Sequence, residues 1–282
     1  MIMEIESAGL TDVGRKRKVN QDTLLLDDGS GLYIVADGMG GHQAGEVASK
    51  VAVETIRDYM ARFRGNDPVE ELLDMDETLS KEANRLLSGI LLANKGIYDI
   101  SRNKLAYRGM GSTVSAIYLN EGMLAAANVG DSPIFLVHNG NIELLSVIHT
   151  VFAEHAALDP VGAEMLGERF RHMLTRAVGI NEFVQPDVFE IQVFGGDILT
   201  ICSDGLTDKV SADEILDVVQ KERPEKACHL LAGMANERGG DDNITVIVLR
   251  VRSIKQSPSG IRGLASRIME WLSKFPLRNK TT

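Results

Sequence analysis

The chain has 282 residues, of which 44% are hydrophobic and 25% are charged, so it is long and apolar enough to bury a full core. Its formal net charge of −10 argues against nucleic acid as the main partner and is compatible with a cation site. Two cysteines, Cys202 and Cys228, exclude a disulfide framework, and the sequence has no signal-peptide core and no apolar run of about 18 residues, which favours a cytoplasmic protein.

Charge is distributed unevenly along the chain. The segment 253–282 contains six basic residues and one acidic residue, Glu270, whereas the rest of the chain is acidic. The turn-forming run Gln256-Ser257-Pro258-Ser259-Gly260 lies close to the point where the charge changes. We therefore expect a main domain over residues 1–252 and a separate basic tail over residues 253–282.

The first predicted elements are a β-hairpin and two helical regions. Residues 23–26 and 32–36 are apolar runs separated by turn-forming residues, which is the pattern of a hairpin. Apolar residues then recur at helical spacing from about 43 to 63 and from about 69 to 103.

The spacing then changes to that of strands. Asn139-Gly140 suits the type I′ turn of a hairpin, and Gly195-Gly196 is expected to join another. A capping box of Ser211 and Glu214 predicts a helix over 211–221, and Pro224 opens one over 224–238. The predicted strands are 113–119, 123–129, 134–138, 141–145, 188–194, 197–203 and 244–251.

The order of these elements indicates the fold class. Because hairpin follows hairpin, the sheets are expected to be antiparallel. Because the helices come in pairs between the hairpins, we expect an α+β architecture in which helix pairs cover the sheets, and a doubly wound parallel fold is excluded.

Four aspartates stand at the ends of predicted strands. Asp37, Asp131 and Asp204 each follow an apolar run, and Asp242 comes directly before the last strand. In an antiparallel sheet the start of one strand lies beside the end of its neighbour, so these carboxylates can meet at one edge. A cluster of carboxylates selects hard cations such as Mg²⁺ or Mn²⁺, and several in one cleft suggest two ions with a shared ligand. Taken singly, each Asp-Gly pair could be an ordinary turn.

Seven short motifs follow one another over residues 7–251. They are Arg17-x-x-Asn20-Gln21-Asp22, Val35-Ala36-Asp37-Gly38-Met39-Gly40-Gly41-His42, Gly109-Met110-Gly111-Ser112-Thr113, Asn128-Val129-Gly130-Asp131-Ser132, Leu174-Thr175-Arg176-Ala177-Val178-Gly179, Ser203-Asp204-Gly205-Leu206 and Gly240-Asp241-Asp242-Asn243-Ile244-Thr245. In this order and at this spacing they resemble the PP2C-like (PPM) metal-dependent serine/threonine phosphatases, in particular their bacterial branch. Each motif is weak alone, but together they are specific.

The resemblance implies a four-layer αββα sandwich of two antiparallel sheets flanked by helix pairs. It also implies two Mn²⁺ or Mg²⁺ ions, a weaker third one, and hydrolysis of phosphoserine and phosphothreonine in proteins by a metal-activated bridging water. It implies that Asp37 bridges the two metals, that the Gly38 carbonyl binds one of them, and that Asp204 and Asp242 bind the other. Asp131 would contribute to the third site together with Asp204, and Arg17 would bind the substrate phosphate.

The chemistry of phosphoryl transfer fits these roles. Positive groups aimed at the outer phosphoryl oxygens matter most in the transition state, and a guanidinium such as that of Arg17 contacts two of them at once. The leaving alkoxide needs a proton, for which His42 or a metal-bound water is a candidate donor. Asp22 is expected to orient water molecules around the metals.

Each of these three residues has a simpler interpretation. Arg17 lies among Arg15, Lys16 and Lys18, which alone would indicate a solvated basic loop. Asp22 could cap a turn, and His42 could cap or pack at the start of a helix.

The chain departs from the family pattern at three positions. Gln21 replaces a common glutamate, so we do not expect it to be a ligand, and Pro133 replaces a usual arginine after Gly130-Asp131-Ser132. Ile148 stands at a usually acidic position. The segment 146–172 that begins there resembles the variable flap beside the active site, so substrate choice and the third metal site are the properties that we expect to differ.

The tail has an amphipathic pattern. Its apolar residues share one helical face with basic residues beside it, which favours docking on an anionic membrane surface or on a partner protein. The alternatives are a helix packed on the protein's own surface and a partly disordered end. The apolar residues are Ile261, Leu264, Ala265, Ile268, Trp271, Leu272 and Phe275.

The predicted function is therefore that of a cytoplasmic protein phosphatase that acts on phosphorylated proteins and reverses a serine/threonine kinase. The tail adds the option of a peripheral location at the membrane. Two alternatives use the same fold: a non-catalytic module that binds phosphoproteins, and a hydrolase of small phosphoesters. The aspartates that are retained at the predicted metal positions argue against the binding module.

Overall fold

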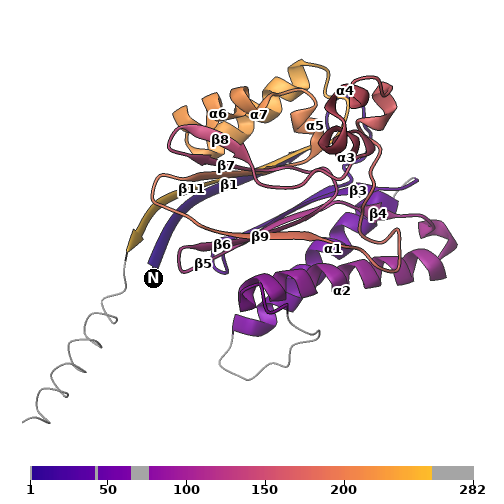
Figure 1. Cartoon of the computed structure of the whole chain (residues 1–282), viewed down its shortest axis with the longest axis horizontal. Helices are drawn as coiled ribbons and strands as arrows, with labels where there is room; N and C mark the ends of the chain where they lie inside the picture. Colours follow the sequence, from indigo (N-terminus) through magenta and orange to yellow (C-terminus); the bar gives the residue numbers. More distant parts are fainter. Residues whose placement is uncertain (1, 42–43, 65–75, 256–282) are drawn as a thin grey trace, which may run out of the picture.

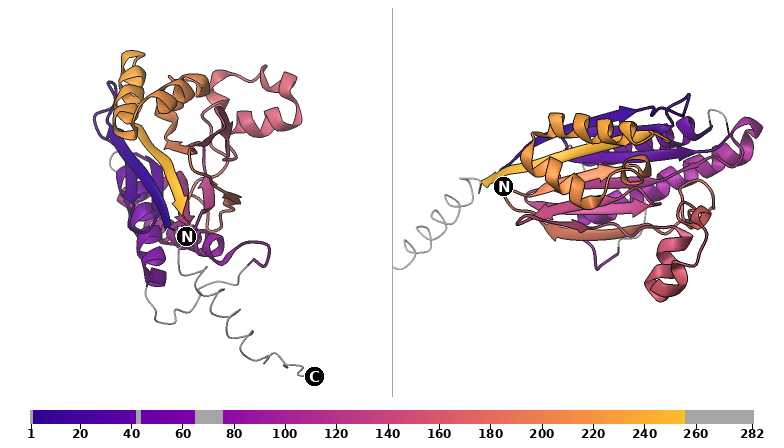
Figure 2. Two further views of the ribbon diagram at one scale, coloured as in Figure 1. Left: turned by 90° about the vertical axis from the view of Figure 1, so that its left-hand side faces the viewer. Right: turned by 90° about the horizontal axis from the view of Figure 1, so that it is seen from above.

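The computed structural model describes residues 2–41, 44–64 and 76–255. Two antiparallel sheets face each other in the middle of the molecule, with a pair of long helices on the outside of each (Figures 1 and 2). This arrangement confirms the predicted αββα sandwich. Two predictions, those for His42 and for residues 256–282 of the tail, lie outside the described residues.

The first sheet has the strand order β1-β11-β10-β7-β8. Helices α6 (Ala212–Lys221) and α7 (Pro224–Glu237) cover its outer face (Figure 1). The predicted capping box of Ser211 and Glu214 is present at the start of α6. The strands are β1 (Ile2–Asp12), β7 (Ile134–His138), β8 (Asn141–Leu144), β10 (Ile198–Cys202) and β11 (Ile244–Lys255).

The second sheet has the strand order β2-β3-β5-β6-β9, with the short strand β4 paired to the end of β3. Helices α1 (Ala44–Ala61) and α2 (Lys81–Asn103) cover its outer face, and the apolar side chains of both helices face it. The strands are β2 (Asp22–Asp27), β3 (Leu32–Met39), β4 (Gly111–Ser112), β5 (Val114–Asn120), β6 (Met123–Val129) and β9 (Asp187–Gln192).

Buried apolar side chains form three layers, one between the two sheets and one beneath each helix pair. The inter-sheet layer includes Tyr33, Ile117, Leu199 and Ile247, which are 0% exposed. None of the described helices is long and apolar enough to cross a lipid bilayer. The remaining short helices are α3 (Val151–Leu158), α4 (Pro160–Ala163), α5 (Asp204–Thr207), η1 (Arg62–Arg64), η2 (Leu105–Tyr107) and η3 (Glu168–Phe170).

The structure corrects one predicted hairpin. Residues 188–194 and 197–203 were expected to pair, but β9 pairs with β6 in one sheet and β10 pairs with β7 and β11 in the other. The Gly195-Gly196 turn therefore crosses between the sheets. It is held by hydrogen bonds from the Gly196 N–H to the Val251 carbonyl at 2.7 Å and from the Val193 N–H to the Gly122 carbonyl at 3.0 Å.

Strand β1 is absent from the sequence prediction. Its inner face carries Met3 and Ile5 but continues with Ser7 and Gly9, so the apolar alternation fades along the strand. Its partner β11 supplies the missing apolar surface, because the two strands pair along their whole length from Ile2↔Lys255 to Asp12↔Ile244.

Candidate metal centre

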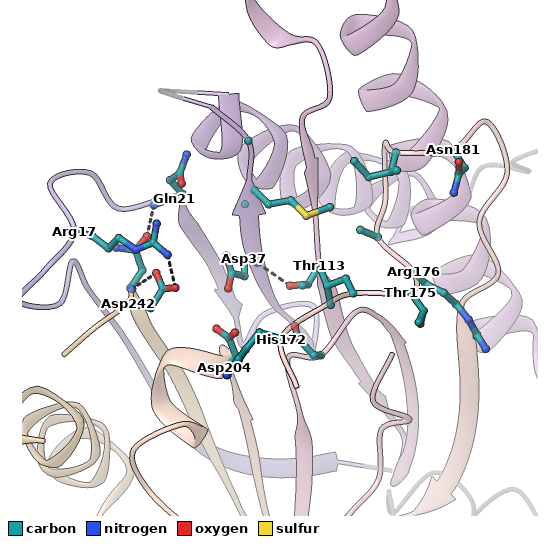
Figure 3. A pocket seen from close by; sticks show the side chains of 18 residues that line it. Arg17, Gln21, Asp37, Thr113, His172, Thr175, Arg176, Asn181, Asp204 and Asp242 are labelled. Carbon is teal, nitrogen blue, oxygen red and sulfur yellow. Dashed lines mark hydrogen bonds and ion pairs between the residues drawn. The ribbon is translucent and has the colours of Figure 1, made fainter. Parts of the chain in front are cut away.

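A cleft of about 520 Å³ lies at the end of the sandwich where β3 ends and α5 begins (Figure 3). Its walls come from both sheets and from loops that are far apart in the sequence. The structure brings together six of the predicted site residues here, and Asp22 is buried beside them. The six residues that line the cleft are Arg17, Asp37, Gly38, Asp131, Asp204 and Asp242.

Asp37 does not end its strand, as the sequence suggested, because β3 continues to Met39 and pairs there with β4. The Asp37 N–H donates to Thr113 Oγ1 at 2.9 Å, and its carbonyl accepts from the Thr113 N–H at 2.8 Å (Figure 3). At Gly38, a Cβ atom would lie 2.0 Å from the Gly45 carbonyl oxygen, so only glycine fits. The carboxylate is therefore held on a rigid strand instead of a mobile turn.

Asp22 lies directly opposite Asp37 in the β2–β3 ladder and is 8% exposed. One of its carboxylate oxygens, Oδ2, accepts hydrogen bonds from Ser203 Oγ at 2.8 Å and Thr245 Oγ1 at 2.7 Å. The other, Oδ1, is buried and has no hydrogen-bond partner among the described residues. Asp22 thus links the two sheets through Oδ2.

Arg17 belongs to the loop between β1 and β2. Its Nη2 donates to Asp242 Oδ2 at 2.7 Å, and its side chain is half exposed in the cleft (Figure 3). The amide of Asn243 holds this loop in place, because its Nδ2 donates to the carbonyls of Val13 at 2.9 Å and Val19 at 3.1 Å. The predicted basic loop is therefore ordered against the start of β11.

Asp204 is not the end of a strand, because β10 ends at Cys202. It is instead the first residue of the short helix α5. Its Oδ1 atom is buried and finds no hydrogen-bond partner within the part of the chain that the structure describes. Burial, reinforced by the negative charges of neighbouring aspartates, holds the pKa of Asp204 well above the usual range, and the pKa of Asp37 is raised for the same reasons.

The pKa values of Asp22 and Asp131 are also raised, mainly by burial, to about 6 each. A group of buried like charges is unfavourable unless a cation compensates it. The buried oxygens of Asp22 and Asp204 that have no hydrogen-bond partner among the described residues also need a cation to compensate their charge. The donors are oxygens, which suits the hard cations Mg²⁺ and Mn²⁺, so the residues present fit a divalent-metal centre.

Two further potential ligands lie beside Asp204. Ligand atoms of His172, Asp204 and Asp208 all lie within 4.8 Å of one another, and His172 Nδ1 is 3.6 Å from Asp208 Oδ2. Asp208 could have been found from its spacing, since it lies one helical turn after Asp204. His172 stands in the variable segment 146–172, where the sequence offers no signal for it.

His149 supports the loop that carries Asp131. It is 0% exposed, its Nδ1 accepts from the Gly130 N–H at 3.0 Å, and its Nε2 therefore carries the proton that is donated to Asp187 Oδ2 at 2.6 Å. Burial lowers the pKa of His149, so the neutral ring is favoured. Arg176, which lines the cleft, completes this group with a 2.8 Å ion pair to Asp187.

The three departures from the family pattern occupy different places. Gln21 lines the cleft. Pro133 and Ile148 line a neighbouring groove of about 600 Å³ that shares Asp131 and Asp204 with the cleft. The segment 146–172, resembling a flap, contains α3, α4 and η3 and supplies His172 to both cavities.

Comparison with known proteins agrees with this geometry. The family profile described as protein phosphatase 2C matches residues 13–236. A phosphatase 2C-type protein of Streptococcus pyogenes serotype M6 is 35% identical over 248 residues, which cover 86% of this chain and 96% of that protein.

Solved structures show the same fold. The serine/threonine phosphatase PstP/Ppp of Mycobacterium tuberculosis has a TM-score of 0.77 at 27% identity, covering 89% of this chain and 100% of that one. A structure of the PstP catalytic domain in complex with two manganese ions has a TM-score of 0.75 at 27% identity, with the same coverage. The chain belongs to the protein phosphatase 2C family.

Proposed function

We propose that this protein hydrolyses phosphoserine and phosphothreonine in proteins, with two Mn²⁺ or Mg²⁺ ions held in the cleft. The observation that carries the proposal is the convergence of five aspartates from both sheets, two of which keep a buried oxygen that has no hydrogen-bond partner among the described residues. The family and the manganese-bound structure of PstP support the same conclusion. When bound, the ions would lower the pKa of a water molecule and offset the charge on the phosphoryl group.

The chain's own residues have distinct parts in this proposal. Asp37 would be the ligand that the two ions share, and the Gly38 carbonyl would help to hold one of them. Asp204 and Asp242 would hold the other ion. Asp131 shares a third, weaker site with Asp204, and the positions of His172 and Asp208 support a site there.

Arg17 is the proposed phosphate-binding residue. Its guanidinium lines the cleft and is bonded to Asp242, so a phosphate dianion would compete with that carboxylate for the same donors. Asp22, with one oxygen fixed by Ser203 and Thr245, orients water near Asp37 through the other oxygen. His42 remains the proposed donor of the proton to the leaving alkoxide.

Turnover of a phosphothreonine peptide and of p-nitrophenyl phosphate tests the function directly. We expect Mn²⁺-stimulated hydrolysis that EDTA abolishes, and a loss of at least about a hundredfold in kcat for Asp204→Asn, since one stabilising group is worth that much or more. Arg17→Lys should raise KM for the peptide. His42→Ala should remove the alkaline limb of the pH–rate profile, because a proton donor loses activity when it is deprotonated at higher pH. Wild-type turnover in Asp204→Asn would overturn the site assignment.

The two alternatives give different results in the same assay. A non-catalytic module would bind the phosphopeptide without releasing phosphate. A small-phosphoester hydrolase would prefer phosphorylated metabolites to phosphopeptides when the two compete.

We further propose that the protein is cytoplasmic and that its substrates are proteins phosphorylated by a serine/threonine kinase. Residues 1–252 would form the phosphatase domain and residues 253–282 the tail. The amphipathic pattern of the tail supports contact with a membrane surface or a partner protein. Strand β11 continues to Lys255, so a truncated chain that ends at Lys255 keeps the sheet intact and should then leave the membrane fraction. If it partitions there like the full chain, tail anchoring is wrong.

A further inference from the structure

Part of the lining of the groove beside the cleft is apolar. It comes from Phe135 and Leu144, which are paired across the β7–β8 ladder, and from Ile148, Phe152 and Pro133. The groove is also lined by acidic side chains, those of Asp131, Asp204 and Asp208. Phe135 is 8% exposed, whereas Leu144 is 49% exposed, so the groove has a buried base and an open rim.

The basic side chains of this groove are already neutralised within the chain. Arg171 forms a 3.3 Å ion pair with Glu164, and its guanidinium carbon lies 4.1 Å from the ring centroid of Phe152. Lys209 is bonded to Asp241. The positive charges of Arg171 and Lys209 are therefore paired within the chain, and the apolar side chains of the groove offer contact area for an aliphatic or aromatic side chain.

The groove is continuous with the proposed metal centre. Asp131, His172 and Asp204 line both cavities, so a substrate whose phosphate occupies the cleft passes the mouth of the groove. An extended peptide advances about 3.3 Å per residue. A side chain two or three residues from the phosphorylated one is therefore displaced by roughly 7–10 Å, which is far enough to leave the centre and enter the groove.

We infer that this groove is a specificity subsite that binds an aliphatic or aromatic side chain of the phosphoprotein within about three residues of the phosphorylated serine or threonine. The inference rests on the proposed function. Two of the departures from the family pattern, Pro133 and Ile148, replace polar residues by apolar ones in this groove. These replacements make the subsite a property of this chain.

The test uses phosphothreonine peptides that are identical except for leucine or serine at one position, from three residues before to three residues after the phosphothreonine. The readout is the ratio of kcat/KM for the leucine and serine peptides, which cancels any general change in turnover. With Mn²⁺ and the full chain, we expect a ratio of about ten or more at one position, typical of one apolar side chain in a pocket.

Variants of the groove should remove this preference. Leu144→Ser and Phe152→Ser are expected to bring the ratio close to one. The matched control is Leu158→Ser, which should keep the wild-type ratio. Leu158 lies in the same variable segment as Phe152 but is 89% exposed and outside the groove. Thermal melting shows that each variant is folded.

Two results would overturn the subsite: a wild-type ratio near one at every position although all peptides are hydrolysed, or a preference that survives in both groove variants. Failure of the proposed function looks different. In that case neither the peptides nor p-nitrophenyl phosphate would be hydrolysed, and the inference would fall with the function.

Discussion

At the scale of single residues, Asp37 and Asp22 place two buried carboxylates next to each other, which is electrostatically unfavourable. The two carboxylates lie opposite each other in the β2–β3 ladder, and both have pKa values raised by burial and by their acidic neighbours. Like charges directly opposite in a sheet are destabilising. The pair therefore costs stability in the metal-free protein. The hydrogen bonds from Ser203 and Thr245 to Asp22 offset part of this cost, and a bound cation would offset more of it.

Replacing Asp37 by asparagine should therefore separate stability from function. Asp37→Asn keeps the shape of the side chain and removes one buried negative charge, so we expect the metal-free protein to melt at a higher temperature. We also expect the stabilisation by Mn²⁺ and the phosphatase activity to be lost. Calorimetry with and without Mn²⁺ measures both effects, and a lower melting temperature of the metal-free variant would show that Asp37 has a different role.

At the scale of elements, the turn after β6 depends on a side chain from another segment. His149 fills a buried position and accepts the hydrogen bond of the Gly130 N–H, next to Asp131. The turn has the positive backbone angle that glycine favours, with φ of 107° at Gly130. The position of Asp131 is therefore set by the segment that leads into α3 as well as by its own strand.

His149→Leu should destabilise the protein by about 1–3 kcal/mol, because the buried N–H of Gly130 would lose its acceptor and Asp187 would lose a donor. The control is His229→Leu on the exposed face of α7, for which we expect a change within about 0.5 kcal/mol. Urea unfolding of the metal-free proteins measures both. Equal stability of the two variants would mean that water replaces the imidazole.

The local hairpins could be predicted from the sequence, whereas contacts between distant parts of the chain could not. The hairpins β5–β6 and β7–β8 follow from strong alternation and turn chemistry, and Asn139 and Gly140 have the positive φ angles that a type I′ turn needs. The crossing at Gly195-Gly196 could not be predicted, because a two-glycine turn looks the same whether its strands share a sheet or not. His172 and His149 were missed because their roles depend on contacts distant in sequence.

For the whole molecule, the acidic cleft sets the pH dependence of stability. Asp22 and Asp131 have a pKa of about 6 in the folded chain, above the ordinary value of 3.8, so the native state binds more protons than the unfolded state between these values. Stability of the metal-free protein should therefore rise as the pH falls from about 7 to about 5. Mn²⁺ should reverse this trend, because bound cations favour the ionised carboxylates.

Thermal melts in EDTA and in Mn²⁺ across this pH range measure the prediction. The expected change in the metal-free protein is a few kcal/mol, since one pKa unit corresponds to about 1.4 kcal/mol for each group. The slope should be smaller in Asp37→Asn, in which one of the interacting charges is gone. A metal-free protein that loses stability steadily from pH 7 to pH 5 would contradict the proposed burial of these carboxylates.

The pairing of Arg17 with Asp242 spans 225 positions of the chain, and Asp22 is fixed by Thr245 of the last strand. During synthesis on the ribosome, the N-terminal part of the cleft is thus made long before its C-terminal part. The centre can assemble only when β11 has emerged and inserted between β1 and β10. A nascent chain therefore has no complete phosphatase site, and the enzyme gains its activity only when the synthesis of its domain is almost finished.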